Sequence, residues 1–329
     1  MSIVSIFNNK GGVGKTTYMF HISHLLAAAG KTVLMVDLDA QCNLSGYCLT
    51  DNALERAWGD RGNSIWRAIE EVYRGVGDVR KRGPLKITDA EGELFLVPGD
   101  VLLSNFEDSL GDTWSGAKGG AEPALRVQSA IYRYIQWAAE HVSADVVMLD
   151  LGPNLGAMNR SVLAASDYFI VPMSPDLFSI RGTENLGNKL VTWNREWAQC
   201  HAAWHGEALA LPPGSPKFLG YVMQQHNVRQ TSTGMTRGWS IFGGRVERAV
   251  QDNIVNKLEP TGQVVHWNTG KWDLGHIPNL HSLIPYSQEA KKPVFSCTGS
   301  DGLTGAHISR ARESRDLFKP IVDTLLNVV

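Results

Sequence analysis

A glycine-rich stretch close to the amino terminus contains the residues whose types and spacing are best suited to chemistry. Residues 10–17 read Lys-Gly-Gly-Val-Gly-Lys-Thr-Thr. Glycines allow the backbone to wrap closely around a phosphate group, with successive N–H groups directed toward it. A lysine beside these N–H groups can meet the outer phosphate oxygens, and a hydroxyl that follows it can bind Mg²⁺. The stretch therefore predicts a phosphate site formed by Gly11, Gly12, Val13, Gly14, Lys15, Thr16 and Thr17.

The residues around this stretch predict the elements that must position it. An apolar run over residues 3–7 precedes it, and Phe20, Leu25 and Ala28 can share one face of a helix that follows. A strand, a glycine-rich turn and a helix form the context that a phosphate-binding loop needs. The positive end of the helix adds attraction for an anion. The alternative, a glycine turn that binds nothing, does not account for the agreement of all three elements.

The spacing differs from the common pattern G-x-x-x-x-G-K-[ST], because Asn9 stands where the first glycine is required. A second lysine, Lys10, begins the motif instead. In this the stretch resembles the deviant Walker A motif of the ParA/MinD family of P-loop ATPases, and within it the ParA (Soj-like) branch. The resemblance implies ATP and Mg²⁺ as cofactors and a homodimer in the ATP-bound state. It also implies catalytic roles for Lys15 and for Lys10, which reaches the nucleotide of the partner subunit.

Two aspartate-bearing segments come directly after apolar runs that are typical of buried strands. Because the carboxyl ends of parallel strands border the ligand crevice of an open sheet, such residues are placed to act. Residues 37–43 resemble the family's D-x-D-P-Q segment, with Ala40 in place of the proline. The resemblance implies that Asp39 orients or activates the attacking water and that Asp37 supports the magnesium region. Carboxylates that cap a turn are the alternative.

The second segment begins at Asp150, at the end of its apolar run. A carboxylate at such a position holds Mg²⁺ in P-loop proteins. Thr16 and, through water, Asp150 are therefore the predicted magnesium residues. Residues 150–156 resemble the family's D-x-P-P-S-L-G segment, although Gly152 and Asn154 replace a proline and a serine. An aspartate that caps the next helix is the alternative.

The base of the nucleotide is assigned through the resemblance. Residues 276–283 resemble the family's x-I-P-R-x-x-x-L segment, which implies that Pro278 packs against adenine. Residues 218–225 resemble the strand that ends beside the base, so Gln224 or Gln225 can read its edge, and the register between them stays open. A preference for ATP over GTP also rests on the resemblance, since the sequence shows no guanine-reading N-K-x-D motif.

Charge limits how the chain can contact nucleic acid. The 329 residues carry a net charge of −2, so a DNA contact requires a local basic patch. One candidate patch consists of Arg229, Arg237, Arg245 and Arg248, with a solvated helix face as an equal alternative. Residues 74–86 are also basic. A solvated loop is the favoured interpretation there, and a contact to a phosphate backbone is the alternative.

Composition and pattern favour one α/β domain over residues 1–329, doubly wound on a mostly parallel sheet. Hydrophobic residues make up 43% of the chain, which is enough for a sizeable core. Glycine and serine residues predict a surface loop over residues 111–122, and apolar spacing predicts one helix over residues 124–142. Insertions are expected near residues 50–92, 108–123, 199–216 and 260–275.

The predicted function combines these parts. We expect a Mg²⁺-dependent ATPase that forms an ATP-switched dimer, binds DNA non-specifically in plasmid or chromosome partition and responds to a ParB-like activator. No apolar run is long enough to span a bilayer, so we expect a cytoplasmic protein without a membrane contact, nucleoid-associated if it binds DNA. Two alternatives stay open. One is a ParA-like ATPase that positions or regulates a non-DNA cargo or partner protein, and the other is a nucleotide-binding scaffold with little turnover.

Overall fold

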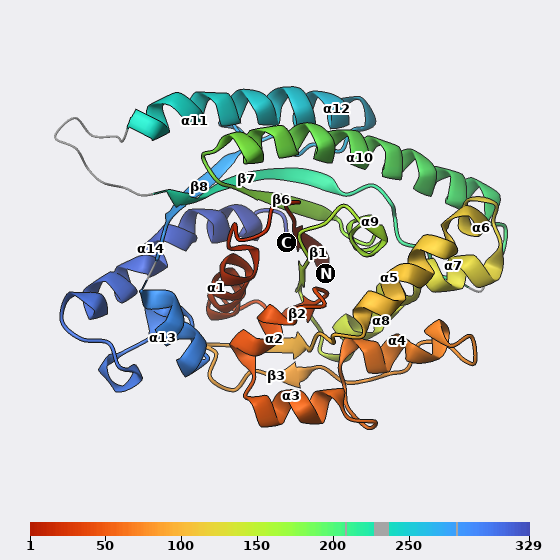
Figure 1. Cartoon of the computed structure of the whole chain (residues 1–329), viewed down its shortest axis with the longest axis horizontal. Coiled ribbons are helices and arrows are strands. Elements are labelled where there is room, and N and C mark those ends of the chain that lie inside the picture. The colour runs from red at the N-terminus through yellow and green to blue at the C-terminus, as the bar shows by residue number, and fades with distance from the viewer. Residues whose placement is uncertain (208, 227–236, 281) are drawn as a thin grey trace.

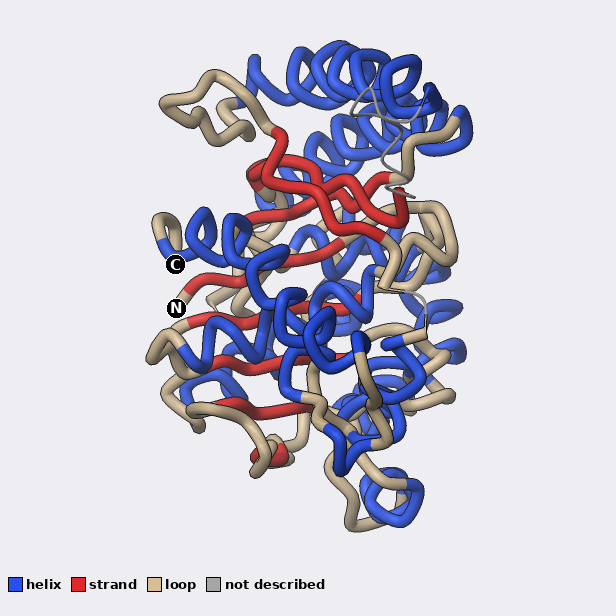
Figure 2. Tube along the Cα trace, turned by 90° about the vertical axis from the view of Figure 1, so that its left-hand side faces the viewer, coloured by secondary structure: helices blue, strands red, loops and turns tan. Residues whose placement is uncertain are grey.

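The computed structural model describes residues 1–207, 209–226, 237–280 and 282–329. Within these residues the strands form one sheet, which crosses the molecule between layers of helices (Figure 1, Figure 2). The strand order is β3-β4-β2-β5-β1-β6-β7-β8, and neighbours run parallel except for the antiparallel pair β3 and β4. The strands are β1 (Ser2–Ile6), β2 (Val33–Asp37), β3 (Leu85–Lys86), β4 (Leu94–Val97), β5 (Val146–Asp150), β6 (Tyr168–Met173), β7 (Lys217–His226) and β8 (Asp273–Pro278).

Helices cover both faces of the sheet, because the strands carry apolar side chains on both sides. In β1, Ile3 packs into one core while Val4 and Ile6 pack into the other, and all three are almost fully buried. Parallel strands that are covered on both faces have such continuous apolar runs. The predicted doubly wound α/β class with a mostly parallel sheet is therefore confirmed.

Each face has its own set of helices. The core that contains Ile3 is closed by helices α4, α5, α8, α9 and α10, and the core that contains Val4 by α1, α2, α13 and α14. The first set spans α4 (Ile65–Tyr73), α5 (Leu103–Asp112), α8 (Ala130–His141), α9 (Ala157–Ala164) and α10 (Leu177–Ala203). The second set spans α1 (Lys15–Ala28), α2 (Asn43–Cys48), α13 (Leu283–Ala290) and α14 (Ala306–Leu326). The other α-helices described are α3 (Asp51–Trp58), α6 (Trp114–Lys118), α7 (Glu122–Gln128), α11 (Arg237–Val250) and α12 (Asn256–Leu258). A π-helical turn covers Gln251–Val255, and 3₁₀ turns cover Glu259–Thr261, Val294–Ser296 and Gly299–Asp301.

The surface loop predicted over residues 111–122 is wrong, because α6 occupies its centre. Trp114 packs edge-on against Trp197 of α10, with ring centroids 5.5 Å apart. Gly116 has ordinary helical geometry, and a Cβ atom there would lie 3.2 Å from the Cβ of Ala124. The glycine therefore allows two helices to approach closely. The local sequence around Trp114 could not predict its contact with Trp197, because Trp197 lies far along the chain.

The single helix predicted over residues 124–142 is also wrong, since α7 and α8 are separated at Ser129. Its backbone has φ −95° and ψ −3°. The carbonyl oxygen of Gln128 accepts a hydrogen bond from the Ser161 hydroxyl at 3.0 Å. This tertiary contact gives the Gln128 carbonyl oxygen the hydrogen bond that an uninterrupted helix would have provided. The apolar spacing continues across the break, so it predicts a single helix. Pro123 lies in the first turn of α7, where its missing N–H group costs no helical hydrogen bond.

The predicted insertions contribute local structure around the sheet. Residues 50–92 contain α3, α4 and β3, and β3 forms one edge of the sheet. The first five residues of the segment 199–216 continue α10, and the remainder leads to β7. Among the described residues, no helix is both long and apolar enough to cross a membrane.

Candidate functional site

The glycine-rich stretch forms the turn between β1 and α1. Gly12 and Gly14 adopt φ values of 72° and 77°, a left-handed conformation that favours glycine. Gly14 is the N-cap of α1, and no side chain caps this helix end. Its first N–H groups therefore have no side-chain acceptor and suit a bound anion. The local sequence produces a phosphate cradle because only glycines fit the two left-handed positions.

Lys15 extends from the first turn of α1 beneath this cradle. Its side chain is almost fully buried, and its Nζ reaches the backbone oxygen of Lys10 at 3.4 Å. Burial lowers the pKa of Lys15, while the carboxylates of Asp150 and Asp39 oppose that shift. The structure thus brings together the lysine and the two predicted carboxylates, although α1, the loop after β2 and the end of β5 supply them from separate parts of the chain.

Asp150 ends β5 directly beside Asp37 of β2, and the two residues are register partners in the sheet. The Asp150 side chain is completely buried, and neither of its oxygens has a hydrogen-bond partner of normal geometry among the described residues. Burial raises the pKa of Asp150 to about 8, and Asp37 and Asp39 add to the shift, whereas the Thr16 hydroxyl and Lys15 oppose it. A buried carboxylate without donors is costly unless a cation accompanies it.

This orphaned carboxylate fits the predicted Mg²⁺. Carboxylate, hydroxyl and water oxygens are the ligands that Mg²⁺ prefers, and the ion commonly keeps several waters beside a nucleotide phosphate. Thr16 and Asp150 supply those two protein groups at the foot of the cradle. The donor set of this site is therefore suited to a hydrated magnesium ion.

Asp37 differs from Asp150 because its hydrogen bonds are already made within the protein. It accepts hydrogen bonds from the Ser45 backbone N–H at 2.8 Å and hydroxyl at 2.6 Å, and from the Asp39 N–H at 3.3 Å. Burial nevertheless raises its pKa to about 6. Asp37 thus holds the start of α2 in place, and its part in the magnesium region is to fix the loop that carries Asp39.

Asp39 lines the hollow in front of the glycine loop. One of its oxygens accepts a hydrogen bond from the Gln41 N–H at 3.0 Å. A Cβ atom on Gly152 would lie 3.5 Å from the same oxygen, so the loops that follow β2 and β5 meet here. The side chain is partly exposed, in contrast to Asp37 and Asp150. Its position is suited to contact a water molecule in the hollow.

Lys10 lies on the outer side of the loop and forms an ion pair with Asp176, the N-cap residue of α10. The two side chains are 33% and 34% exposed. An ion pair of this kind contributes about 0–1 kcal/mol. Lys10 is therefore close to the phosphate cradle but not buried in it, and a stronger anion can replace Asp176 as its partner.

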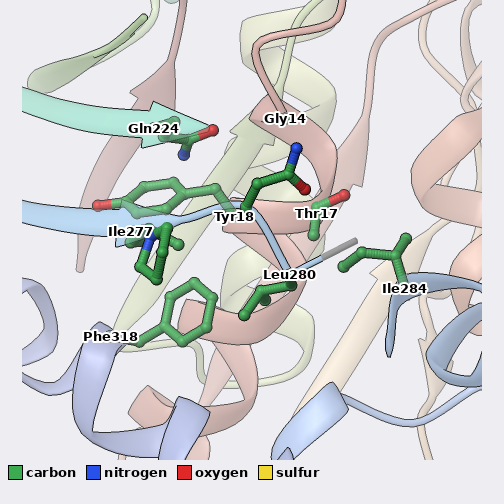
Figure 3. A pocket seen from close by; sticks show the side chains of 10 residues that line it. Gly14, Thr17, Tyr18, Gln224, Ile277, Leu280, Ile284 and Phe318 are labelled. Atoms are coloured by element: carbon green, nitrogen blue, oxygen red, sulfur yellow. The ribbon is translucent and has the colours of Figure 1, made fainter. Parts of the chain in front are cut away.

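Two adjoining hollows extend from the loop, and both are lined by Gly14, Thr17 and Ile284. The phosphate hollow has a volume of about 440 Å³ and includes Lys15 and Asp39. The base hollow is bordered by Pro278, Asn279 and Gln224. The other residues that line it include Tyr18, Ile277, Leu280 and Phe318, which are labelled in Figure 3.

One of the two glutamines considered from the sequence borders the base hollow. Gln224 lines it, and Figure 3 shows the Tyr18 ring reaching toward Gln224 and Ile277. The buried Tyr18 hydroxyl has no hydrogen-bond partner among the described residues. The side chain of Gln225 lies outside the residues whose side chains are described.

Sequence reasoning missed two side chains that border the phosphate hollow, Tyr47 and Gln288. The Tyr47 hydroxyl is 2.9 Å from the Thr17 hydroxyl, and Gln288 lies beside Tyr47 at the same hollow. Tyr47 follows the Asp39 loop closely enough to have been suspected. Gln288 lies in α13, far along the chain, and nothing in its local sequence connects it to the loop.

The predicted arginine patch is described only in part. Arg229 lies outside the described residues, and the side chain of Arg237 is likewise not described. Arg245 and Arg248 are exposed on α11, with Glu247 between them. Figure 1 shows α11 outside α10, on the β8 side of the sheet.

Comparison with known proteins follows from this geometry. A protein-family model described as an AAA domain (AAA_31) matches residues 1–199. The chain is similar to the chromosome-partitioning ATPase Soj of Thermus thermophilus, with 31% identity over 183 residues, which is 56% of this chain and 59% of that protein. It is also similar to the sporulation initiation inhibitor protein Soj of Bacillus subtilis, with 28% identity, 56% of this chain and 63% of that protein. The chain thus spans less than two thirds of the length of these curated relatives.

Solved structures share the fold over more of the chain. Protein DIP2308 from Corynebacterium diphtheriae has 26% identity and a TM-score of 0.70, and the match covers 88% of this chain and 97% of that one. The structure of pNOB8 ParA bound to nonspecific DNA has 18% identity and a TM-score of 0.59, with 100% and 99% covered. The second likeness bears on the fold alone.

Proposed function

Since this chain belongs to the AAA-domain family and within it to the ParA/MinD group of P-loop ATPases, we propose that it hydrolyses ATP with Mg²⁺. The observation that carries the proposal is the buried, unpartnered carboxylate of Asp150 beside Lys15, under a glycine loop with an open helix end. Bound Mg²⁺ neutralises phosphate charge. The protein's share of the chemistry is positioning and charge stabilisation, which are most of what phosphoryl transfer needs.

Each residue has a defined task in this proposal. The N–H groups of Gly11 to Thr17 bind the phosphates, and the Lys15 ammonium binds their outer oxygens. Thr16 and, through water, Asp150 hold the metal. Asp39 orients the attacking water, since it borders the hollow with one oxygen fixed by Gln41. Pro278 packs against the adenine, and Gln224 reads its edge.

We propose that ATP joins two copies of the chain across this edge of the sheet. Leu177 and Phe178, which follow β6, are 56% and 79% exposed, and Val101 and Leu102, which follow β4, are 55% and 39% exposed. All four lie beyond the carboxyl ends of parallel strands, on the nucleotide side. Exposed apolar groups of this kind suit burial against a partner. Lys10 would then exchange Asp176 for the partner's nucleotide.

The proposed biological role is based on the roles named for the similar proteins. The ATP-bound dimer binds DNA non-specifically in plasmid or chromosome partition, with Arg245 and Arg248 on α11 as contacts, and a ParB-like protein stimulates it. The exposure of both arginines supports this. Such a protein works in the cytoplasm, on the nucleoid. Slow turnover is expected, because a switch must keep its ATP state long enough to use it.

Light scattering tests the proposal directly. The purified protein is measured with Mg²⁺–ADP and with Mg²⁺ and a non-hydrolysable ATP analogue, each with and without non-specific duplex DNA. A dimer that forms only with the analogue and then coats DNA is expected. A nucleotide-dependent dimer that ignores DNA would transfer the proposal to another cargo.

A second measurement separates hydrolysis from scaffolding. Wild-type protein should hydrolyse ATP, and Asp39→Ala should stop hydrolysis while ATP analogue binding persists. If wild-type turnover is no higher than that of Asp39→Ala, the chain is a nucleotide-binding scaffold and the ATPase proposal fails.

A further inference from the structure

A hollow of about 450 Å³ opens at the edge of the sheet that is formed by β3, away from the nucleotide site. One wall is the end of α3 and the turn after it, and the other is the segment that leads into β3 (Figure 1). Four cationic side chains line it: Arg56, Arg61, Lys81 and Arg82. We propose that this hollow binds the phosphodiester backbone of duplex nucleic acid.

The four cations differ from the basic residues around them. Three neighbouring arginines have a carboxylate partner: Arg67 pairs with Glu70 at 2.9 Å, Arg80 with Glu71, and Arg133 with Asp78 at 2.5 Å. By contrast, the cations of the hollow form no ion pair with any part of the chain that the structure describes. In a chain with a net charge of −2, four unneutralised cations around one hollow constitute a strong local field.

Arg82 adds an independent indication of a ligand. Its Nε is completely buried and has no hydrogen-bond partner among the described residues, and its Nη2 reaches only the backbone oxygen of Asp60, at 3.5 Å. The Asp60 carboxylate is instead 3.4 Å from Arg67. The Arg82 guanidinium therefore makes only this one long contact with the described residues, and a phosphate oxygen at its Nη side is an acceptor that suits such a group.

The two walls are fixed relative to each other before any ligand arrives. The Asn63 amide donates to the Gly83 oxygen at 2.9 Å, and the Tyr134 hydroxyl donates to the Arg82 oxygen at 2.6 Å. A Cβ atom on Gly62 would lie 2.0 Å from the Ala57 oxygen, so only glycine allows this turn. Binding at a preformed hollow does not require the chain to be ordered at the same time.

The lining selects the class of ligand. Arg56, Arg61 and Lys81 are exposed, which suits a polymer that passes across the opening better than an enclosed metabolite. Among the described residues that line the hollow, none is aromatic, so it offers no surface for stacking of unpaired bases. Contacts to phosphates alone are independent of sequence and depend strongly on salt. The site is separate from Arg245 and Arg248, since α3 and α11 lie at opposite ends of the view in Figure 1.

The test compares two variants that lose the same charge. In the first, Arg56, Arg61 and Lys81 are replaced by Gln. In the control, Lys217, Lys271 and Arg310 are replaced by Gln, since these exposed residues lie scattered over β7, the segment before β8, and α14. The affinity of each protein for a short fluorescein-labelled DNA duplex is measured in Mg²⁺–ADP over a range of KCl. The hollow predicts contacts between a single copy of the chain and DNA, which add to the contacts of the proposed ATP dimer. The ADP state therefore measures the contacts of the hollow without those of the dimer.

The four phosphate contacts of the hollow contribute about −3.6 to the slope of log K against log [salt], and of these four the hollow variant retains only the contact of Arg82. Its slope should therefore be shallower than that of wild type by about 2.7, whereas the control should keep the wild-type slope. Between about 50 and 200 mM salt, four such contacts correspond to an affinity loss of about 150-fold. Both variants should unfold at the wild-type temperature and keep the ATP-dependent dimer.

Two outcomes would overturn the proposal. Equal slopes in the hollow variant and the control would show that bulk charge alone attracts DNA. In the second outcome, labelled polyglutamate binds the hollow variant more weakly than wild type, while the DNA slope of the variant stays at the wild-type value. This result would identify an acidic protein segment as the occupant.

Discussion

Asp37 and Asp150 are neighbours in the sheet and both are fully buried, yet their surroundings are opposite. Asp37 accepts three hydrogen bonds from Ser45 and Asp39, whereas Asp150 accepts none of normal geometry from the described residues. A satisfied buried carboxylate stabilises the structure around it, and an unsatisfied one costs free energy until its partner arrives. Asp37 therefore stabilises the structure of the site, whereas Asp150 is left available for a ligand.

The largest expected effect is on ATP turnover. Asp150→Asn should lower ATP hydrolysis at least about 100-fold, because it removes charge that the transferring phosphate and its metal require. The same change should not lower the melting temperature of the ligand-free protein, since it replaces a buried carboxyl group that makes no hydrogen bond of normal geometry with the described residues. Hydrolysis is followed by phosphate release and stability by thermal unfolding. A variant that melts well below wild type would show that Asp150 has a structural role as well.

Substitution of Asp37, in contrast, should lower the stability of the protein. Asp37→Asn loses charge-assisted hydrogen bonds from Ser45 and leaves buried donors unpaired, which should lower the free energy of unfolding by about 2–4 kcal/mol. Urea unfolding measures this, with Ser45→Ala as a milder control at about 1–2 kcal/mol. Equal stability of Asp37→Asn and wild type would remove the distinction between the two aspartates.

Two buried histidines on α1 extend the comparison to pH. His21 is fully satisfied, with its Nδ1 2.6 Å from the Thr17 oxygen and its Nε2 accepting from the Val294 N–H at 2.9 Å, whereas the His24 Nε2 has no partner among the described residues. Burial lowers the pKa of His21 to about 4 and that of His24 to about 3, with His21 adding to the second shift. Both side chains are therefore neutral in the folded protein.

The sign of the pH effect follows from these directions. Below the unfolded pKa of about 6.5, the unfolded chain binds protons that the folded chain does not, so stability present above pH 6.5 is lost as the pH falls toward 4. The loss for His21 alone is on the order of 3 kcal/mol. Urea unfolding at pH 7 and near pH 5 measures about 2 kcal/mol of this loss, since pH 5 lies above the folded pKa, and His24→Gln should reduce the difference between the two pH values. The raised pKa values of Asp150 and Asp37 act with the opposite sign in the same pH range, so the test is the comparison of wild type with His24→Gln. An equal pH dependence of the two proteins would contradict a neutral buried His24.

The smallest expected effect concerns the proposed dimer surface. Phe178→Ser should weaken ATP-dependent dimerisation about tenfold, because an exposed aromatic anchor is lost, and should leave the monomer's stability unchanged. Tyr73→Ser, at a 39% exposed apolar position on α4, is the matched control and should leave dimerisation as it is. Analytical ultracentrifugation with the ATP analogue measures the dimerisation of both variants. Equal dimerisation of the two variants would exclude Phe178 from the interface.

Local sequence was sufficient wherever a residue acts through its own backbone or its place at a strand end. Gly12 and Gly14 could be read from the sequence because left-handed positions favour glycine, and Asp39 and Asp150 because apolar runs end just before them. The class of fold followed from the same alternation of apolar runs and helical patterns.

What could not be read depends on contacts between distant segments. Asp150 and Asp37 look alike in sequence, and only the placement of Ser45 distinguishes them. The helix α6 forms because Trp114 meets Trp197, and Lys10 meets Asp176 through a turn that follows β6. In each case the contacting residue lies in another element, so the spacing of residues along the chain does not predict the contact.

Thermal unfolding of wild type and Asp150→Asn, with and without Mg²⁺ and a non-hydrolysable ATP analogue, tests the central claim most directly. Mg²⁺ and the analogue together should raise the melting temperature of wild type, since a ligand at 100 times its Kd adds about 2.7 kcal/mol. The variant should start at least as stable and gain much less. If it gains as much as wild type, Asp150 does not serve the bound nucleotide and its metal, and the account is contradicted.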